Sequence, residues 1–196
     1  RDSSTRVNEE GSGNTEILRD GVTNMVLAGY SVGHFANDLC ASMWFIYLSY
    51  YLISVVGLSS NVAGLAAVGL IADGITTPIV GYFSDKLACA CGKRNTWYYM
   101  GSLLVMPSFL FIFLDFSFLG HGTAGQTAWY VTWPAIFNVG WASVQISHLA
   151  IVNQLSYSQR KRDQLSTYRN GATYGANILV LSLALGLFYF IDNQTL

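Results

Sequence analysis

Apolar residues fall in five long runs along this chain, separated by short polar stretches. Each run has at least the ~20 residues that a helix needs to cross a bilayer. The chain begins instead with a polar segment rich in Ser, Gly, Asn and Glu, for which we predict a disordered cytosolic tail over residues 1–23. The remainder, residues 24–196, predicts an all-α membrane protein with spans at residues 25–56, 61–83, 97–119, 127–155 and 168–191.

The ten lysines and arginines follow this pattern. They occur only in the tail, after the second run and around the start of the fifth run. Alternating helices place all three positions on one side of the membrane, which the positive-inside rule makes cytosolic. We therefore expect a cytosolic N-terminus. Since the number of spans is odd and the first residue is Arg1, we also expect the chain to be a fragment.

Composition agrees with a multi-pass protein whose main partner is the lipid bilayer. Hydrophobic residues make up 52% of the chain and charged residues only 11%, too few to cover a soluble surface. The net charge of −1 gives no support for nucleic-acid binding.

Three of the predicted spans carry polar residues three or four positions apart, on one helical face. Ionised groups at membrane depth are costly and usually functional. We expect these residues to line one hydrated cavity; the alternative is that they only hydrogen-bond to one another and join the helices. The candidate substrate or ion-binding residues are His34, Asn37, Asp38, Asp73, Thr77, Gln145 and His148.

Charged residues with glycines follow the second run. The spacing Gly81-x-x-x-Asp85 and the later Gly92-Lys93-Arg94 resemble the cytosolic loop between the second and third helices of the major facilitator superfamily. Residues 30–38, 72–81 and 160–170 resemble its branch of glycoside–pentoside–hexuronide:cation symporters. The resemblance implies twelve helices in two six-helix halves, and this chain would supply the first five of them. It also implies secondary transport of a small-molecule substrate by alternating access.

The resemblance assigns roles to single positions. Asp38 matches an acid that contacts substrate in the sugar symporters, and Asp73 matches the first of two acids that bind the coupling cation. The second acid is replaced by Thr77, and another substrate-contacting acid by Gln145. These departures imply an incomplete sodium site and favour a proton linked to Asp73 as the coupling ion, with no other cofactor.

Residues 33–45 are similar to the organellar cysteine transporters of this branch. We therefore expect cysteine import into lysosomes or melanosomes, with the plasma membrane as the alternative location. A cation-coupled symporter of sugars or other small solutes is the second hypothesis. A third, from another class, is a non-transporting short chain that pairs with a full-length transporter. An enzyme is not expected, because Asp73 lacks the Gly-x-Gly-Asp pattern of intramembrane aspartyl proteases.

The cytosolic loops also predict a conformational latch. Asp85 can accept hydrogen bonds from a helix N-terminus or from an arginine such as Arg162, and this would close the cytosolic side in one state. The alternative is a solvated charge cluster that only sets topology. The candidate latch residues are Gly81, Asp85, Lys86, Gly92, Lys93, Arg94, Arg162 and Arg169.

Overall fold

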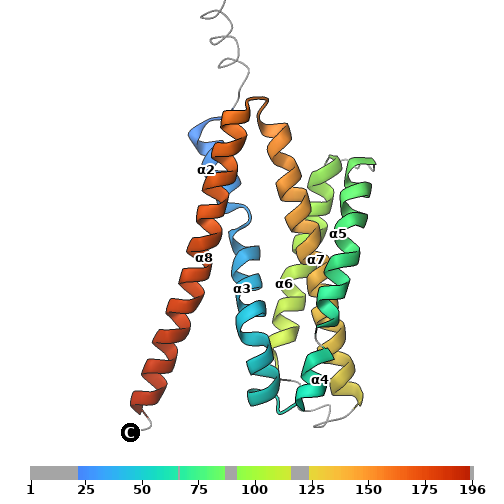
Figure 1. Cartoon of the computed structure of the whole chain (residues 1–196), viewed down its shortest axis with the longest axis vertical. Coiled ribbons are helices and arrows are strands. Elements are labelled where there is room, and N and C mark those ends of the chain that lie inside the picture. The colour runs from blue at the N-terminus through green and yellow to red at the C-terminus, as the bar shows by residue number, and fades with distance from the viewer. Residues whose placement is uncertain (1–21, 66, 87–91, 116–123, 195–196) are drawn as a thin grey trace, which may run out of the picture.

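The computed structural model describes residues 22–65, 67–86, 92–115 and 124–194, and these contain helices and no strand. The predicted tail, except for residues 22 and 23, lies outside this part of the chain. The helices run alternately up and down, so that the C-terminal end of α5 and the N-terminal ends of α6 and α8 lie at one end of the bundle (Figure 1). The described part is therefore an all-α bundle with membrane-length helices.

The first apolar run forms three consecutive pieces, α2 (Asn24–Val32), α3 (Phe35–Tyr50) and the π-helical η1 (Tyr51–Val55). Thr23 caps α2, because its hydroxyl accepts a hydrogen bond from the Val26 amide at 3.3 Å. The helix breaks at Gly33 and His34, which leaves His34 at the N-cap position of α3. A break at membrane depth needs internal hydrogen-bond partners, and the Gly33 carbonyl receives one from the Tyr98 hydroxyl at 2.5 Å.

The second run differs from the others, since it is divided into α4 (Ser60–Leu65) and α5 (Val68–Lys86). Four stretches in the described residues are long and apolar enough to span a membrane, and this run is not one of them: Asn24–Val55, Lys93–Phe113, Ala124–Leu155 and Gln159–Ile191. In α5 the aspartates, the adjacent threonines and the glycines lower the mean hydropathy. Its membrane position therefore depends on packing as much as on its own sequence.

Helix α7 (Ala124–Leu155) packs against α5 and against α6 (Lys93–Phe113). Two glycines allow the α6–α7 contact. A Cβ atom at Gly101 would lie 2.7 Å from the Gly140 carbonyl oxygen, and one at Gly140 would lie 3.0 Å from the Gly101 carbonyl oxygen. Small residues permit such close backbone approach between membrane helices. This seam is the tightly packed side of the bundle.

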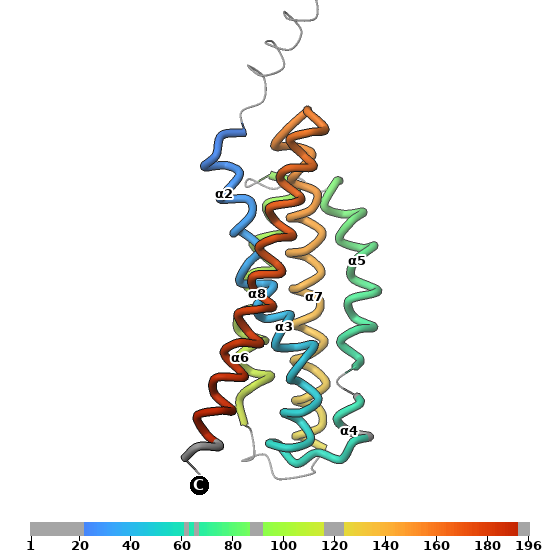
Figure 2. Tube along the Cα trace, turned by 60° about the vertical axis from the view of Figure 1, so that its left-hand side comes forward, coloured from blue at the N-terminus to red at the C-terminus, as the bar shows by residue number. Residues whose placement is uncertain are grey.

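Helix α8 (Gln159–Gln194) lies along α2 and α3, at the opposite edge of the bundle from α5 (Figures 1 and 2). Most of its apolar side chains point outward, as expected for a surface in contact with lipid or with further helices. Its inward face meets the break between α2 and α3. Polar side chains of α3, α7 and α8 gather at this place.

Candidate functional site

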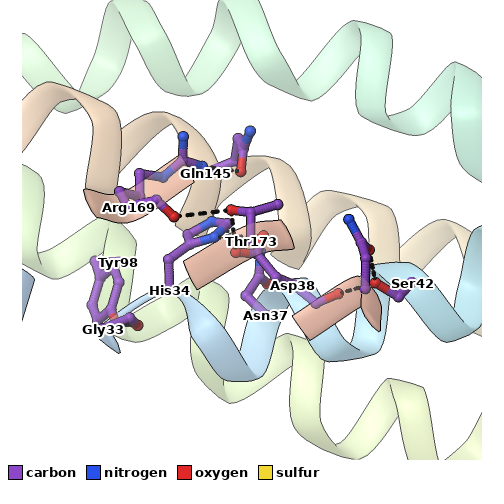
Figure 3. Close-up of polar contacts among 10 residues, drawn as sticks. Gly33, His34, Asn37, Asp38, Ser42, Tyr98, Gln145, Arg169 and Thr173 are labelled. Carbon is purple, nitrogen blue, oxygen red and sulfur yellow. Dashed lines mark hydrogen bonds and ion pairs between the residues drawn. The ribbon is translucent and has the colours of Figure 1, made fainter. Parts of the chain in front are cut away.

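The site is built around Asp38, at the first turn of α3. Its carboxylate is 7% exposed. The Oδ1 atom lies 2.8 Å from Nδ1 of His34, and Oδ2 accepts a hydrogen bond from the Thr173 hydroxyl of α8 at 2.8 Å (Figure 3). Both carboxylate oxygens are therefore held by partners from two different helices, which offsets part of the cost of burying the charge.

The same face of α3 continues to Ser42, one turn further along. Its hydroxyl contacts the side-chain oxygen of Asn177 on α8 and lies 2.9 Å from the Asp38 carbonyl oxygen. Because Thr173 and Asn177 are four residues apart, they share a face of α8. Polar contacts thus join α3 to α8 over two turns.

Arg169 lies on that face as well, one turn before Thr173. It is 8% exposed, and its Nη2 atom donates to the Gln145 side-chain oxygen of α7 at 3.1 Å (Figure 3). The sequence suggested Arg169 for the cytosolic latch, but the structure places it in the site. Since α8 begins at Gln159, Arg169 lies ten residues, or ~15 Å, along the helix.

His148 completes the cluster from α7. Its ring stacks on Tyr30 of α2 with 4.2 Å between centroids, and the Tyr30 hydroxyl donates to the His148 carbonyl oxygen at 3.2 Å. The ring of His34 is 5.2 Å away. In the described part of the chain, Nε2 of His148 and Nε of Arg169 are buried without a hydrogen-bond partner. A buried unpaired donor or acceptor is costly, so this cluster is the least satisfied part of the α2, α3, α7 and α8 contact.

Two of the three predicted polar sets therefore meet, those of α3 and α7, whereas Asp73 and Thr77 lie elsewhere. They are half-buried on α5, and the Thr77 hydroxyl donates to Asp73 Oδ1 at 3.3 Å. Helix α5 packs on α7 and α6, and not against α8. The structure thus separates the predicted cation position from the predicted substrate position.

Five residues of the site were missed from the sequence: Tyr30, Ser42, Tyr98, Thr173 and Asn177. For α8 a signal existed. Arg169, Thr173 and Asn177 recur every four residues at the start of an apolar run, which marks one polar stripe on a membrane helix. The two tyrosines carried no such signal, because aromatic residues in a span usually pack in the core or at the interface.

In the predicted latch, the partner of Asp85 is Arg94. Its Nη2 and Nε atoms lie 2.9 and 3.2 Å from Asp85 Oδ1, and its Nη1 atom contacts the Ala150 carbonyl oxygen of α7. Arg162, which the sequence suggested as a partner, instead donates to Gln159 at 2.7 Å. The pair therefore ties the C-terminal end of α5 and the N-terminal end of α6 to the end of α7.

The other latch candidates have separate surroundings. Lys86 contacts the Tyr82 hydroxyl, and its ammonium lies 4.0 Å from that ring centroid. Gly92 has a φ of +95°, a conformation that favours glycine, at the start of α6 before Lys93. A Cβ at Gly81 would meet nothing within 4 Å. Only Asp85 and Arg94 thus form an ion pair among the described residues of this set.

The chemistry of the cluster is that of polar and charged side chains. Among the residues that the structure describes, no group of three or more His, Cys, Asp or Glu side chains is placed to hold a metal ion. The cluster instead offers a buried carboxylate, a buried guanidinium and two imidazoles where four helices meet. These groups recognise charge and hydrogen-bonding pattern.

Comparison with known proteins identifies the family. The model of the family described as MFS/sugar transport protein matches residues 29–195. Over 161 residues, 79% of this chain, it is 44% identical to the human major facilitator superfamily domain-containing protein 12, and 42% identical over 159 residues to the mouse protein. It is also 30% identical over 171 residues, 85% of this chain, to the isoprimeverose transporter of Lactiplantibacillus pentosus.

These matches cover 34%, 33% and 34% of the human, mouse and bacterial proteins. The chain thus spans about a third of the length of the curated relatives it matches. The sequence motifs predicted a member of the major facilitator superfamily. The comparisons confirm this prediction at the level of the family. The chain belongs to the MFS/sugar transport protein family, within the major facilitator superfamily.

Proposed function

We propose that this chain forms part of a secondary transporter that carries a zwitterionic amino acid, most specifically cysteine, from the cytosol into lysosomes or melanosomes. The observation that carries the proposal is the pair of buried opposite charges, Asp38 and Arg169. Thr173 lies between them in the α3–α8 seam. Its hydroxyl donates to Asp38 and lies 3.3 Å from the main-chain carbonyl oxygen of Arg169.

The two charges form no ion pair with each other, although both belong to the described part of the chain. Arg169 contacts a neutral amide, Gln145, and keeps its Nε free. A buried charge without a charged partner is costly and is usually kept for a ligand. A solute carboxylate would supply that partner at Arg169, and the solute ammonium would lie beside Asp38, whose oxygens already contact His34 and Thr173.

Cysteine is favoured over other amino acids by the similarity of residues 33–45 to organellar cysteine transporters. Those residues include His34, Asn37 and Asp38 of the site. The same similarity favours the lysosomal or melanosomal membrane, and the positions of the lysines and arginines favour a cytosolic N-terminus. A sugar is the second candidate, because one relative is named as an isoprimeverose transporter. Gln145 argues against it, since the resemblance places an acid at that position in sugar symporters.

The test is uptake of radiolabelled cysteine into organelles that carry the complete transporter containing this segment. We expect uptake above background that unlabelled cysteine reduces and that cysteine methyl ester, which lacks the carboxylate, does not. Competition by a sugar but not by cysteine would replace the first assignment with the second. No cysteine uptake above background would refute it.

Arg169→Lys sharpens this test. Lysine keeps the charge but loses the planar fork that binds a carboxylate through two donors. A hydrogen bond to a charged group contributes about 1.5–3 kcal/mol, so we expect an apparent KM at least about tenfold higher. Arg160→Lys is the matched control, because Arg160 is exposed at the start of α8. Equal effects of the two substitutions would contradict binding at Arg169.

A further inference from the structure

His34, Asn37 and Asp38 form a hydrogen-bonded set within the first turn of α3. They are 0%, 6% and 7% exposed. Nδ1 of His34 lies 2.8 Å from Asp38 Oδ1, and Nε2 lies 3.1 Å from the side-chain nitrogen of Asn37. Both ring nitrogens of a fully buried histidine therefore have side-chain partners from the same helix turn (Figure 3).

The orientation of the Asn37 amide decides the tautomer of His34. With the amide nitrogen facing Nε2, as in this structure, that nitrogen donates and Nε2 carries no proton. The single proton is then on Nδ1, which donates it to Asp38. His34 is thus a neutral imidazole between an anion and an amide donor, with Nε2 able to take up one more proton.

Asn37 has the group that a second proton would need. Its Oδ1 atom is buried and has no hydrogen-bond partner in the described part of the chain. Rotating the amide by a half-turn exchanges oxygen and nitrogen, so that Oδ1 would accept from a protonated Nε2. The same three side chains can therefore hold His34 with one proton or with two.

Charged and titratable groups face this set from every neighbouring helix. Asp38 is the anion in contact with His34. Across from the set lie the other charged or titratable groups: Tyr30 of α2, Tyr98 of α6, His148 of α7 and Arg169 of α8. The His34 and His148 rings are 5.2 Å apart. Two imidazolium ions at that distance beside Arg169 would repel one another, so the cluster accommodates one added proton.

We propose that His34 is the proton-binding residue of this site and that rotation of the Asn37 amide accompanies proton binding. A hydronium ion gives up the proton, so that one of its O–H bonds breaks and water is left, and one N–H bond forms at Nε2, while the hydrogen bond from Nδ1 to Asp38 remains. This differs from the expectation that Asp73 binds the coupling proton, since Asp73 has Thr77 as its partner and no contact with the set.

The consequence for transport rests on the proposed function. A protonated His34 neutralises Asp38, and so does the ammonium group of a bound amino acid. The two cations therefore compete for one carboxylate, and by linkage each reduces the binding of the other. Loading of solute would release the proton from His34, and the transporter would exchange one for the other.

The experiment is a titration of the purified protein with ¹⁵N-labelled histidine and asparagine, followed by NMR. The chain has three histidines, and His34→Gln assigns the signal of His34 by its loss. Over the pH range in which the protein stays folded, we expect His34 to gain a second proton at Nε2 as the pH falls. The side-chain amide signals of Asn37, assigned by their loss in Asn37→Ser, should move with the same midpoint.

Two substitutions give the comparison. Asp38→Asn should remove the preference for Nδ1–H and shift the midpoint of His34, whereas Asp73→Asn should leave both unchanged. A single proton on His34 throughout this range, or Asn37 signals that do not move with it, would overturn the proposal. The wild-type titration decides this even if Asp38→Asn fails to fold. The titration needs no solute. Its result is therefore independent of whether the protein transports cysteine.

Discussion

The two membrane-depth acids, Asp38 and Asp73, lie in different surroundings. Asp38 is 7% exposed and has partners on its own helix and on α8. Asp73 is half-buried on α5 and has Thr77 alone as a hydrogen-bond partner within the described residues. An acid whose two oxygens are both held within the bundle is part of a preformed site. One with a single weak partner keeps oxygens available to an ion or to a helix beyond α5.

The helix seams beside these acids differ in the same way. The α6–α7 seam is closed by glycine backbones and by aromatic packing next to it, such as Phe109 against Phe137 at 6.1 Å. The α3–α8 seam is instead joined by hydroxyl, carboxylate and amide groups. Close packing cannot change in small steps, whereas hydrogen bonds can exchange partners. We infer that the first seam is the rigid part and the second the part that responds to ligand.

The largest effect is expected where packing is tightest. Gly101→Ala places a Cβ 2.7 Å from the Gly140 carbonyl oxygen, so the α6–α7 backbones must separate. Overpacking costs about 1–3 kcal/mol, and we expect the thermal unfolding midpoint in detergent to fall by several degrees. The matched control is Gly74→Ala on α5, where a Cβ meets nothing within 4 Å. Equal midpoints for the two variants would contradict a rigid α6–α7 seam.

The next effect separates the two acids directly. In the complete transporter, Asp38→Asn removes a charge that His34 and Thr173 hold, and we expect solute uptake about tenfold to a hundredfold lower through a raised KM. Asp73→Asn should leave that KM within about twofold, because Asp73 does not contact the site. Uptake kinetics with varied solute check both. A raised KM for Asp73→Asn and an unchanged one for Asp38→Asn would reverse the assignment.

Much of this comparison could be predicted from the sequence. The spacing of residues along a helix and the energetic cost of an acid in a membrane span can both be read from a short stretch of sequence. Runs of apolar residues predicted membrane helices, and the four-residue spacing of His34 and Asp38 placed both on one face. Which helices meet is not local. The approach of α8 that brings Thr173 to Asp38 joins residues 135 positions apart. The break at Gly33 is supported by Tyr98, 65 positions away.

The smallest effect on stability, and the most informative about motion, is expected at the Asp85–Arg94 pair. Asp85 is 60% exposed, and exposed ion pairs contribute at most about 1 kcal/mol, so Asp85→Asn should not change folding or membrane insertion. If the pair holds the adjoining ends of α5 and α6 against α7 in one state of the transport cycle, the variant should transport more slowly at an unchanged KM. Asp163→Asn is the matched control, because that exposed acid accepts only from Gln159 on its own helix. A slower rate in Asp85→Asn but not in Asp163→Asn assigns the effect to the contact between helices, whereas unchanged uptake kinetics in both would leave Asp85 and Arg94 as surface charges.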